Sequence, residues 1–252
     1  MIVDHDGYEG YLYSNMSENT QALEQADWNI VFPYAKQSFF DRVYQLYPRE
    51  AYNSTFWQRA YVWGDYIIDC PTYYMASAVA DAGLATYKLI FNAGTQLHGA
   101  TAPFIYAANN DPSMSSFPKC LPSALYTLYA PFNSLDSSVK ENRGIALLYA
   151  PLRRMSKQLT STSAAVNNAT IASHMKDWII SFVTTLDPNA VSYANISSKP
   201  QWPQYNPRLG TNGSTPEFAI MDVNYTQIGV IPDPDVNAKC DFFHASSYDV
   251  RN

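Results

Sequence analysis

Two side chains of this sequence, Glu9 and His98, carry the groups that serine-dependent hydrolysis requires besides the serine itself. His98 lies in the loop that follows residues 84–91, whose two sides alternate as in a β-strand. Glu9 lies in a polar, turn-rich loop after a short apolar run. In α/β sheets, the loops that leave the carboxyl ends of the strands hold the reactive groups. In a hydrolytic triad a carboxylate orients an imidazole, which takes the proton from a serine hydroxyl.

The serine of such a triad, on a G-x-S-x-G turn, is absent from the 252 residues. Without that hydroxyl, an acid and a histidine cannot form an acyl-enzyme. In one large class of hydrolases the order along the chain is serine, acid, histidine. A chain that holds only the last two is therefore expected to be the C-terminal portion of such an enzyme.

The composition excludes several other classes of function. The formal net charge of −6, with 16 Lys and Arg residues that form no cluster, argues against a nucleic-acid partner. No apolar stretch is long enough to span a membrane as a helix. With 47% hydrophobic residues the chain can bury one substantial core, so a globular, soluble protein is expected.

The sequence also carries features of a secreted protein. It has six N-x-[ST] glycosylation sequons, at Asn15, Asn53, Asn168, Asn195, Asn212 and Asn224. The first residues have neither the basic nor the apolar region of a signal peptide. We therefore expect a secreted, extracellular protein whose natural N-terminus lies upstream of Met1, so that this chain is a fragment.

Apolar spacing predicts the elements that position the candidate residues. Two helices are expected within residues 19–46, divided at Pro33, with Leu23 and Ile30 among the apolar positions of the first. Further helices are expected over 55–68, from Pro71 to Gly83, over 144–159 and over 174–186. An irregular surface excursion is expected at about 107–140, and residues 190–231 are expected to be loop and short strand.

Four separated blocks of the sequence carry a family resemblance. They are Ile2-Val3-Asp4-His5-Asp6-Gly7-Tyr8-Glu9-Gly10, the segment 64–71, the strand and loop leading to His98-Gly99, and Trp178 and Phe182 followed by 187–189 and 202–205. In order and spacing they resemble the C-terminal half of a type B carboxylesterase, of the cholinesterase and fungal lipase family. The resemblance implies an α/β-hydrolase fold, here a partial central sheet flanked by helices, and residues 1–252 as the C-terminal portion of that domain.

The resemblance also implies roles for individual residues. Glu9 matches the triad acid and His98 the triad histidine. Tyr8 stands where the family pattern has Asp, which leaves Asp6 as an alternative acid, and Thr101 stands where members commonly have Glu. A further implication is a disulfide between Cys70 and Cys240. Cys120 is then free or paired with a cysteine of the missing half.

The implied activity is carboxylic ester hydrolysis, with an ester as substrate and no cofactor. The isolated chain is expected to be inactive, because serine and oxyanion hole would belong to the N-terminal half, its expected partner. Two alternatives are a non-catalytic, cholinesterase-like binding or adhesion domain, and a truncated product that exposes half a sheet. His5, His174 and His244 have no second His or Cys at ligand spacing and are expected to be structural or exposed, so no metal site is expected.

Overall fold

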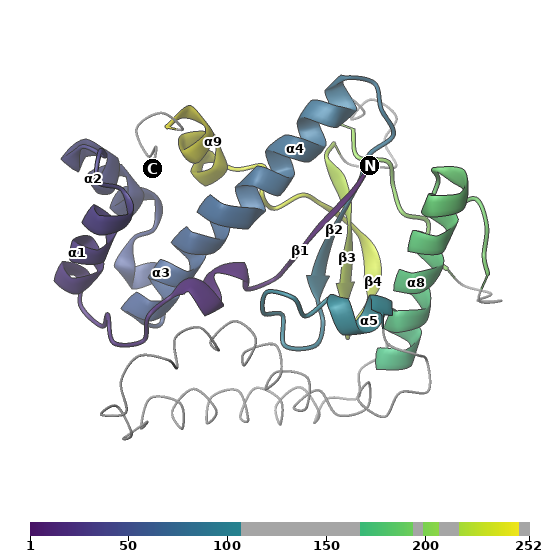
Figure 1. Ribbon diagram of the computed structural model, residues 1–252, viewed down its shortest axis with the longest axis horizontal. Coiled ribbons are helices and arrows are strands. Elements are labelled where there is room, and N and C mark those ends of the chain that lie inside the picture. The colour runs from purple at the N-terminus through teal and green to yellow at the C-terminus, as the bar shows by residue number, and fades with distance from the viewer. Residues whose placement is uncertain (107–166, 194–198, 207–216, 247–252) are drawn as a thin grey trace, which may run out of the picture.

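The computed structural model describes residues 1–106, 167–193, 199–206 and 217–246, and has an α/β fold built on a mixed four-stranded sheet (Figure 1). The strand order is β1-β2-β3-β4. β1, β2 and β3 are parallel, and β4 runs antiparallel to β3. The strands are β1 (Ile2–Asp6), β2 (Tyr87–Asn92), β3 (Ala219–Asn224) and β4 (Ile228–Pro232). The expected excursion at 107–140, the expected helix over 144–159 and Cys120 lie outside the described residues.

Most of the described helical structure lies in the connection from β1 to β2. It comprises the 3-10 turn η1 (Glu9–Tyr13), the helices α1 (Gln21–Val31) and α2 (Gln37–Leu46), the 3-10 turn η2 (Arg49–Ala51), the helix α3 (Thr55–Gly64), the π-helical turn η3 (Asp65–Asp69) and the helix α4 (Cys70–Asp81). After β2 come α5 (Ala102–Tyr106), α8 (Asn168–Thr185) and, after β4, α9 (Ala238–Ala245). In Figure 1, α1, α2 and α3 lie to one side of the sheet and α8 to the other.

Each face of the sheet has its own core. On one face Val3, Ile90 and Ile220 belong to a cluster with residues of α1 to α4 and α9. On the other face Leu89 and Met221 belong to a cluster with residues of α5 and α8. Because β2 is a central strand covered on both faces, its residues Tyr87 to Phe91 are all buried.

The expected helices within 19–46 are present, but two of the apolar positions assigned to the first, Leu23 and Ile30, are wrong. Leu23 is 49% and Ile30 is 77% exposed, whereas α1 buries Glu24 and Trp28. The reason is Arg59 of α3, which stacks over the ring of Trp28 at 4.8 Å. A buried guanidinium needs acidic partners, and Asp27 of α1 forms an ion pair with Arg59, so α1 turns this side toward α3.

The boundary expected before Pro71 is a local irregularity rather than a break. Helix α3 passes through η3 directly into α4, and Pro71 lies in the first turn of α4, where the missing N–H costs nothing. The disulfide between Cys70 and Cys240 is present and joins α4 to α9. Helix α9 itself has no counterpart among the expected elements.

A network of buried charges ties the sheet to the segment after β4. The ammonium of Lys88 on β2 is fully buried and contacts Asp233 at 2.7 Å and Asp235 at 2.5 Å. His5 on β1 contacts Asp235 through Nε2 at 2.9 Å and Asp69 through Nδ1 at 3.2 Å. Burial by itself lowers the pKa of His5, but the charge of Asp69 and the hydrogen bond to Asp235 raise it to about 9.

Candidate active site

Glu9 and His98 follow two neighbouring parallel strands. Asp6, the last residue of β1, is in register with Phe91 of β2, so both strands end at the same edge of the sheet. Beyond the strands the two loops stay joined, because the main-chain N–H of Tyr8 donates to the carbonyl of Gln96 at 2.7 Å. The sheet therefore brings residues 89 positions apart to one place.

The carboxylate of Glu9 and the imidazole of His98 are in direct contact. His98 Nδ1 lies 2.6 Å from Glu9 Oε2, and Glu9 Oε1 accepts the main-chain N–H of Asp6 at 2.6 Å. Glu9 is 3% exposed, while the side chain of His98 is 43% exposed. Because the buried acid binds Nδ1, Nε2 is the nitrogen that remains free to accept a proton from a hydroxyl. In a triad the two ring nitrogens have these same two roles.

The contact also affects the proton affinity of the imidazole. The hydrogen bond to Glu9 raises the pKa of His98 above its ordinary value, and the charges of Glu9 and Asp6 act in the same direction. Partial burial opposes them by disfavouring the charged form. The pair is thus arranged to stabilise an imidazolium, the species that forms when a histidine takes a proton during catalysis.

Asp6, the alternative acid, forms no hydrogen bond with the imidazole in the structure. Its Oδ2 accepts the main-chain N–H groups of Gly99 and Ala100 at 2.7 and 3.0 Å, and its Oδ1 accepts the hydroxyl of Thr101 at 2.7 Å. Burial raises the pKa of Asp6 to about 7, with the neighbouring charge of Glu9 adding to the increase and the hydrogen bond from Thr101 opposing it. These hydrogen bonds join the end of β1 to the loop that carries His98.

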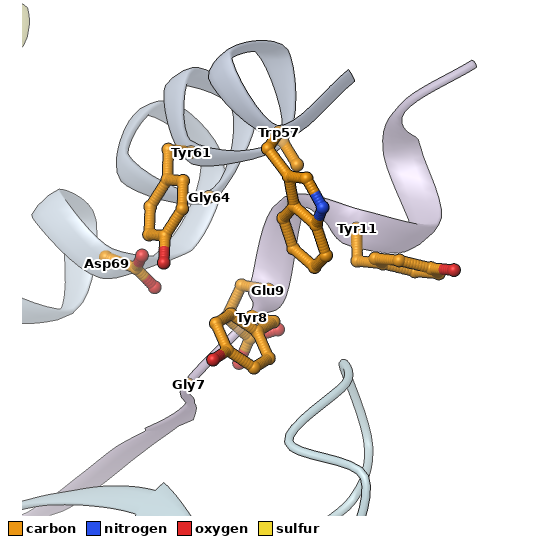
Figure 2. A pocket seen from close by; sticks show the side chains of 10 residues that line it. Gly7, Tyr8, Glu9, Tyr11, Trp57, Tyr61, Gly64 and Asp69 are labelled. Atoms are coloured by element: carbon orange, nitrogen blue, oxygen red, sulfur yellow. The ribbon is translucent and has the colours of Figure 1, made fainter. Parts of the chain in front are cut away.

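A small pocket lies beside Glu9, between η1 and α3 (Figure 2). Its walls include the rings of Tyr8, Trp57 and Tyr61 and the carboxylate of Asp69. The rings of Tyr8 and Trp57 meet edge to face at 5.5 Å. The pocket has a cavity volume of about 10 Å³, close to what one water molecule requires.

Sequence reasoning missed Tyr13 and Asp69 as neighbours of this site. The ring of Tyr13 lies 5.7 Å from the imidazole of His98, and Asp69 reaches the pocket from η3. The only signal for Tyr13 was an aromatic residue one turn after Glu9. The π-helical turn that directs Asp69 has no sequence pattern that would distinguish it from ordinary helix.

The other three histidines form no hydrogen bond with Glu9 or His98 in the described part of the chain. His5 and His174 are buried and His244 is exposed. Within the described residues no group of three or more His, Cys, Asp or Glu side chains could hold a metal ion, and no described helix could cross a membrane. Of the sequons, Asn15 and Asn53 are exposed, Asn168 and Asn224 are half-buried, and Asn195 and Asn212 lie outside the described residues.

Comparisons with known proteins place the fold. No protein-family model matches the chain, and no curated protein matches its sequence. Solved structures do match, among them the crystal structure of Aspergillus niger EstA, with a TM-score of 0.62 and 17% sequence identity. The match covers 99% of this chain and 40% of EstA. The chain thus has an esterase-like α/β fold and spans less than half the length of that neighbour.

Proposed function

We propose that this chain is the acid- and histidine-bearing part of a serine carboxylic ester hydrolase, with Glu9 and His98 as two members of a Ser-Glu-His triad. The observation that carries the proposal is the 2.6 Å contact between Glu9 Oε2 and His98 Nδ1 at the carboxyl edge of the sheet. The esterase-like fold is its context. The serine would come from a segment outside these 252 residues, and the chain would be the C-terminal portion of a type B carboxylesterase domain.

The chemistry assigned to the pair is acyl transfer in two steps. The serine oxygen attacks the ester carbonyl while His98 takes the serine proton at Nε2, and His98 then gives that proton to the departing alcohol. Water attacks the acyl-enzyme, with its proton passing through His98 to the serine, and the carboxylic acid leaves. Throughout, Glu9 holds the imidazole through Nδ1 and stabilises its positive form.

The proposal is tested by assaying p-nitrophenyl esters with and without the missing half. We expect the 252-residue chain alone to be inactive, and the polypeptide encoded by the in-frame gene including sequence upstream of Met1 to turn over the ester. A fluorophosphonate should label that longer polypeptide and stop the reaction. Serine-reagent-sensitive turnover by the 252-residue chain alone would refute the assignment of the nucleophile to another segment.

If the chain instead belongs to a non-catalytic binding or adhesion domain, the longer polypeptide should show neither ester turnover nor labelling by the fluorophosphonate. It would have no esterase activity, with or without a substitution of His98. The direct contact of Glu9 with His98 favours the enzyme, because a domain used only for binding has no need of a buried carboxylate on a half-exposed imidazole.

We also propose that the protein is secreted and glycosylated. The exposed positions of Asn15 and Asn53 support glycan attachment there. Asn224 is the contrasting case, because its side chain is half-buried at the end of β3. Glycopeptide mass spectrometry of the protein secreted from a eukaryotic host should find glycans at Asn15 and Asn53. Unmodified peptides at both positions would contradict the proposal.

A further inference from the structure

Asp6 forms hydrogen bonds with Glu9 and with the three residues that follow His98. Through its main-chain N–H it donates to Glu9 Oε1 at 2.6 Å. Through its carboxylate it accepts hydrogen bonds from Gly99, Ala100 and Thr101, the three residues that follow His98. One residue therefore fixes the acid on one side and the histidine loop on the other.

The loop itself requires such an anchor. Gly99 has a φ of +87°, so the chain turns sharply directly after His98. Two main-chain N–H groups of this turn, those of Gly99 and Ala100, have the same carboxylate oxygen as partner. Since Asp6 is the last residue of β1, its position is set by the sheet, and the turn is held relative to the sheet rather than to solvent-exposed loop atoms.

We propose that Asp6 is a positioning residue for His98: it holds the histidine loop at the distance from Glu9 at which the short Nδ1–Oε2 hydrogen bond forms. The effect on catalysis rests on the proposed function, but the effect on the hydrogen bond does not. Asp6 contacts neither the reacting atoms nor, by hydrogen bonds, the imidazole. Besides the effect of its charge on the pKa of His98, it therefore acts through the geometry of the pair.

The first test measures the hydrogen bond in the 252-residue chain by NMR. The readouts are exchange of the His98 Hδ1 proton with water and the pKa of His98 from its Hε1 shift. Thr101→Val removes one donor to Asp6 without changing any charge, and Thr101→Ser restores it. We expect Thr101→Val and Asp6→Asn each to speed Hδ1 exchange at least about tenfold. The pKa of His98 tests positioning in Thr101→Val, where it should fall with no charge removed, because Asp6→Asn lowers it through the lost charge as well. Thr101→Ser should behave as wild type.

The matched control is Asp177→Asn. Asp177 is also buried, accepts the main-chain N–H of Tyr193 and pairs with Lys199, but it lies on α8. The Asp177→Asn variant should leave the exchange of the His98 Hδ1 proton and the pKa of His98 unchanged. A folded Asp6→Asn variant with wild-type exchange and pKa would overturn the inference. If that variant does not fold, identical behaviour of Thr101→Val and Thr101→Ser would do the same.

The second test uses the catalytically complete polypeptide. A displacement of reacting groups by about 1 Å costs up to about 10²-fold in rate, so Asp6→Asn should lower kcat about 10- to 100-fold with KM within about twofold. A change in His98 exchange with no ester turnover in any form would leave the positioning role standing and defeat the hydrolase assignment. Ester turnover that Asp6→Asn leaves at the wild-type rate would support the hydrolase assignment and defeat the positioning role of Asp6.

Discussion

Gly10 lies so close to α3 that a methyl group on its Cα would stand 1.8 Å from the carbonyl oxygen of Ala60. The same methyl group would stand 2.4 Å from the main-chain nitrogen of Gly64. Both contacts are with backbone, which cannot move aside as a side chain can. The residue after Glu9 is therefore a point where η1 and α3 meet without an intervening side chain.

Gly10→Ala should accordingly destabilise the protein and displace Glu9. Overpacking of a buried site costs about 1 to 3 kcal/mol, and we expect the upper part of that range in urea unfolding. Gly229→Ala is the matched control, because its nearest contact beyond the neighbouring residues is 3.9 Å, to the side chain of Gln227. Equal stability of the two variants would show that η1 does not depend on this close approach.

Glu9→Gln should lower the pKa of His98. The hydrogen bond and the charge of Glu9 favour the imidazolium, so the neutral amide shifts the equilibrium toward the neutral ring. In the proposed complete esterase the acid limb of the kcat/KM profile would move to lower pH while kcat falls by about 10⁴-fold. NMR titration of Hε1 measures the pKa, with the exposed Glu50→Gln as a control that should not change it.

Lys88→Met should be strongly destabilising. It leaves Asp233 without its ammonium partner and removes one of the two cationic partners of Asp235. Breaking a buried ion pair from one side costs about 3 to 5 kcal/mol. The exposed Lys36→Met should stay within about 0.5 kcal/mol of wild type in the same denaturant titration. A loss below about 1 kcal/mol for Lys88→Met would mean that the acids are protonated at neutral pH.

His5 should make stability fall in alkaline solution. Its pKa is raised to about 9 in the folded protein, above the ordinary value of 6.5. A raised pKa means that the folded state binds the proton more tightly, so this contribution is full below about pH 6.5 and is lost as pH rises through about 9. Unfolding free energies between pH 6 and 10 should show this loss in wild type and in His244→Gln, but not in His5→Gln.

Reduction of the disulfide should lower stability by about 5 kcal/mol on the loop-entropy model, because Cys70 and Cys240 are 170 residues apart. Urea unfolding with and without dithiothreitol measures the difference. The double variant Cys70→Ala/Cys240→Ala should unfold at the same urea concentration in both buffers. If wild type also unfolds at the same urea concentration with and without dithiothreitol, the disulfide does not constrain the unfolded chain.

The sequence predicted those elements whose pattern is local. Residues 84–91 were expected to form a strand, and β2 covers Tyr87–Asn92. The helix expected at 174–186 ends where Asp187-Pro188 predicted, although it begins earlier, at Asn168. Glu9 and His98 could be placed in loops from local pattern, but their contact depends on β1 and β2 being neighbours, which no local pattern states.

Other features depend on partners far along the chain. Lys88 belongs to an alternating strand pattern, yet it is buried because Asp233 and Asp235 neutralise it from 145 and 147 residues away. Trp28 of α1 is buried beneath Arg59, a residue of another helix. Asp6 could be considered as an acid from its type, but its donors are main-chain groups and a hydroxyl whose directions only the folded loop defines.

The pairing of Asp6 with Phe91 has one more consequence. A slip of one residue between β1 and β2 would move the histidine loop by about 3.3 Å, more than the whole separation of Nδ1 and Oε2, and would place the β2 side chains of each core on the opposite face of the sheet. The division of the β2 side chains between the two cores opposes such a slip, and it therefore also sets the distance between the carboxylate of Glu9 and the imidazole of His98. Substitutions that weaken the pairing of β1 with β2 should therefore break the hydrogen bond between Glu9 and His98 before the rest of the molecule unfolds.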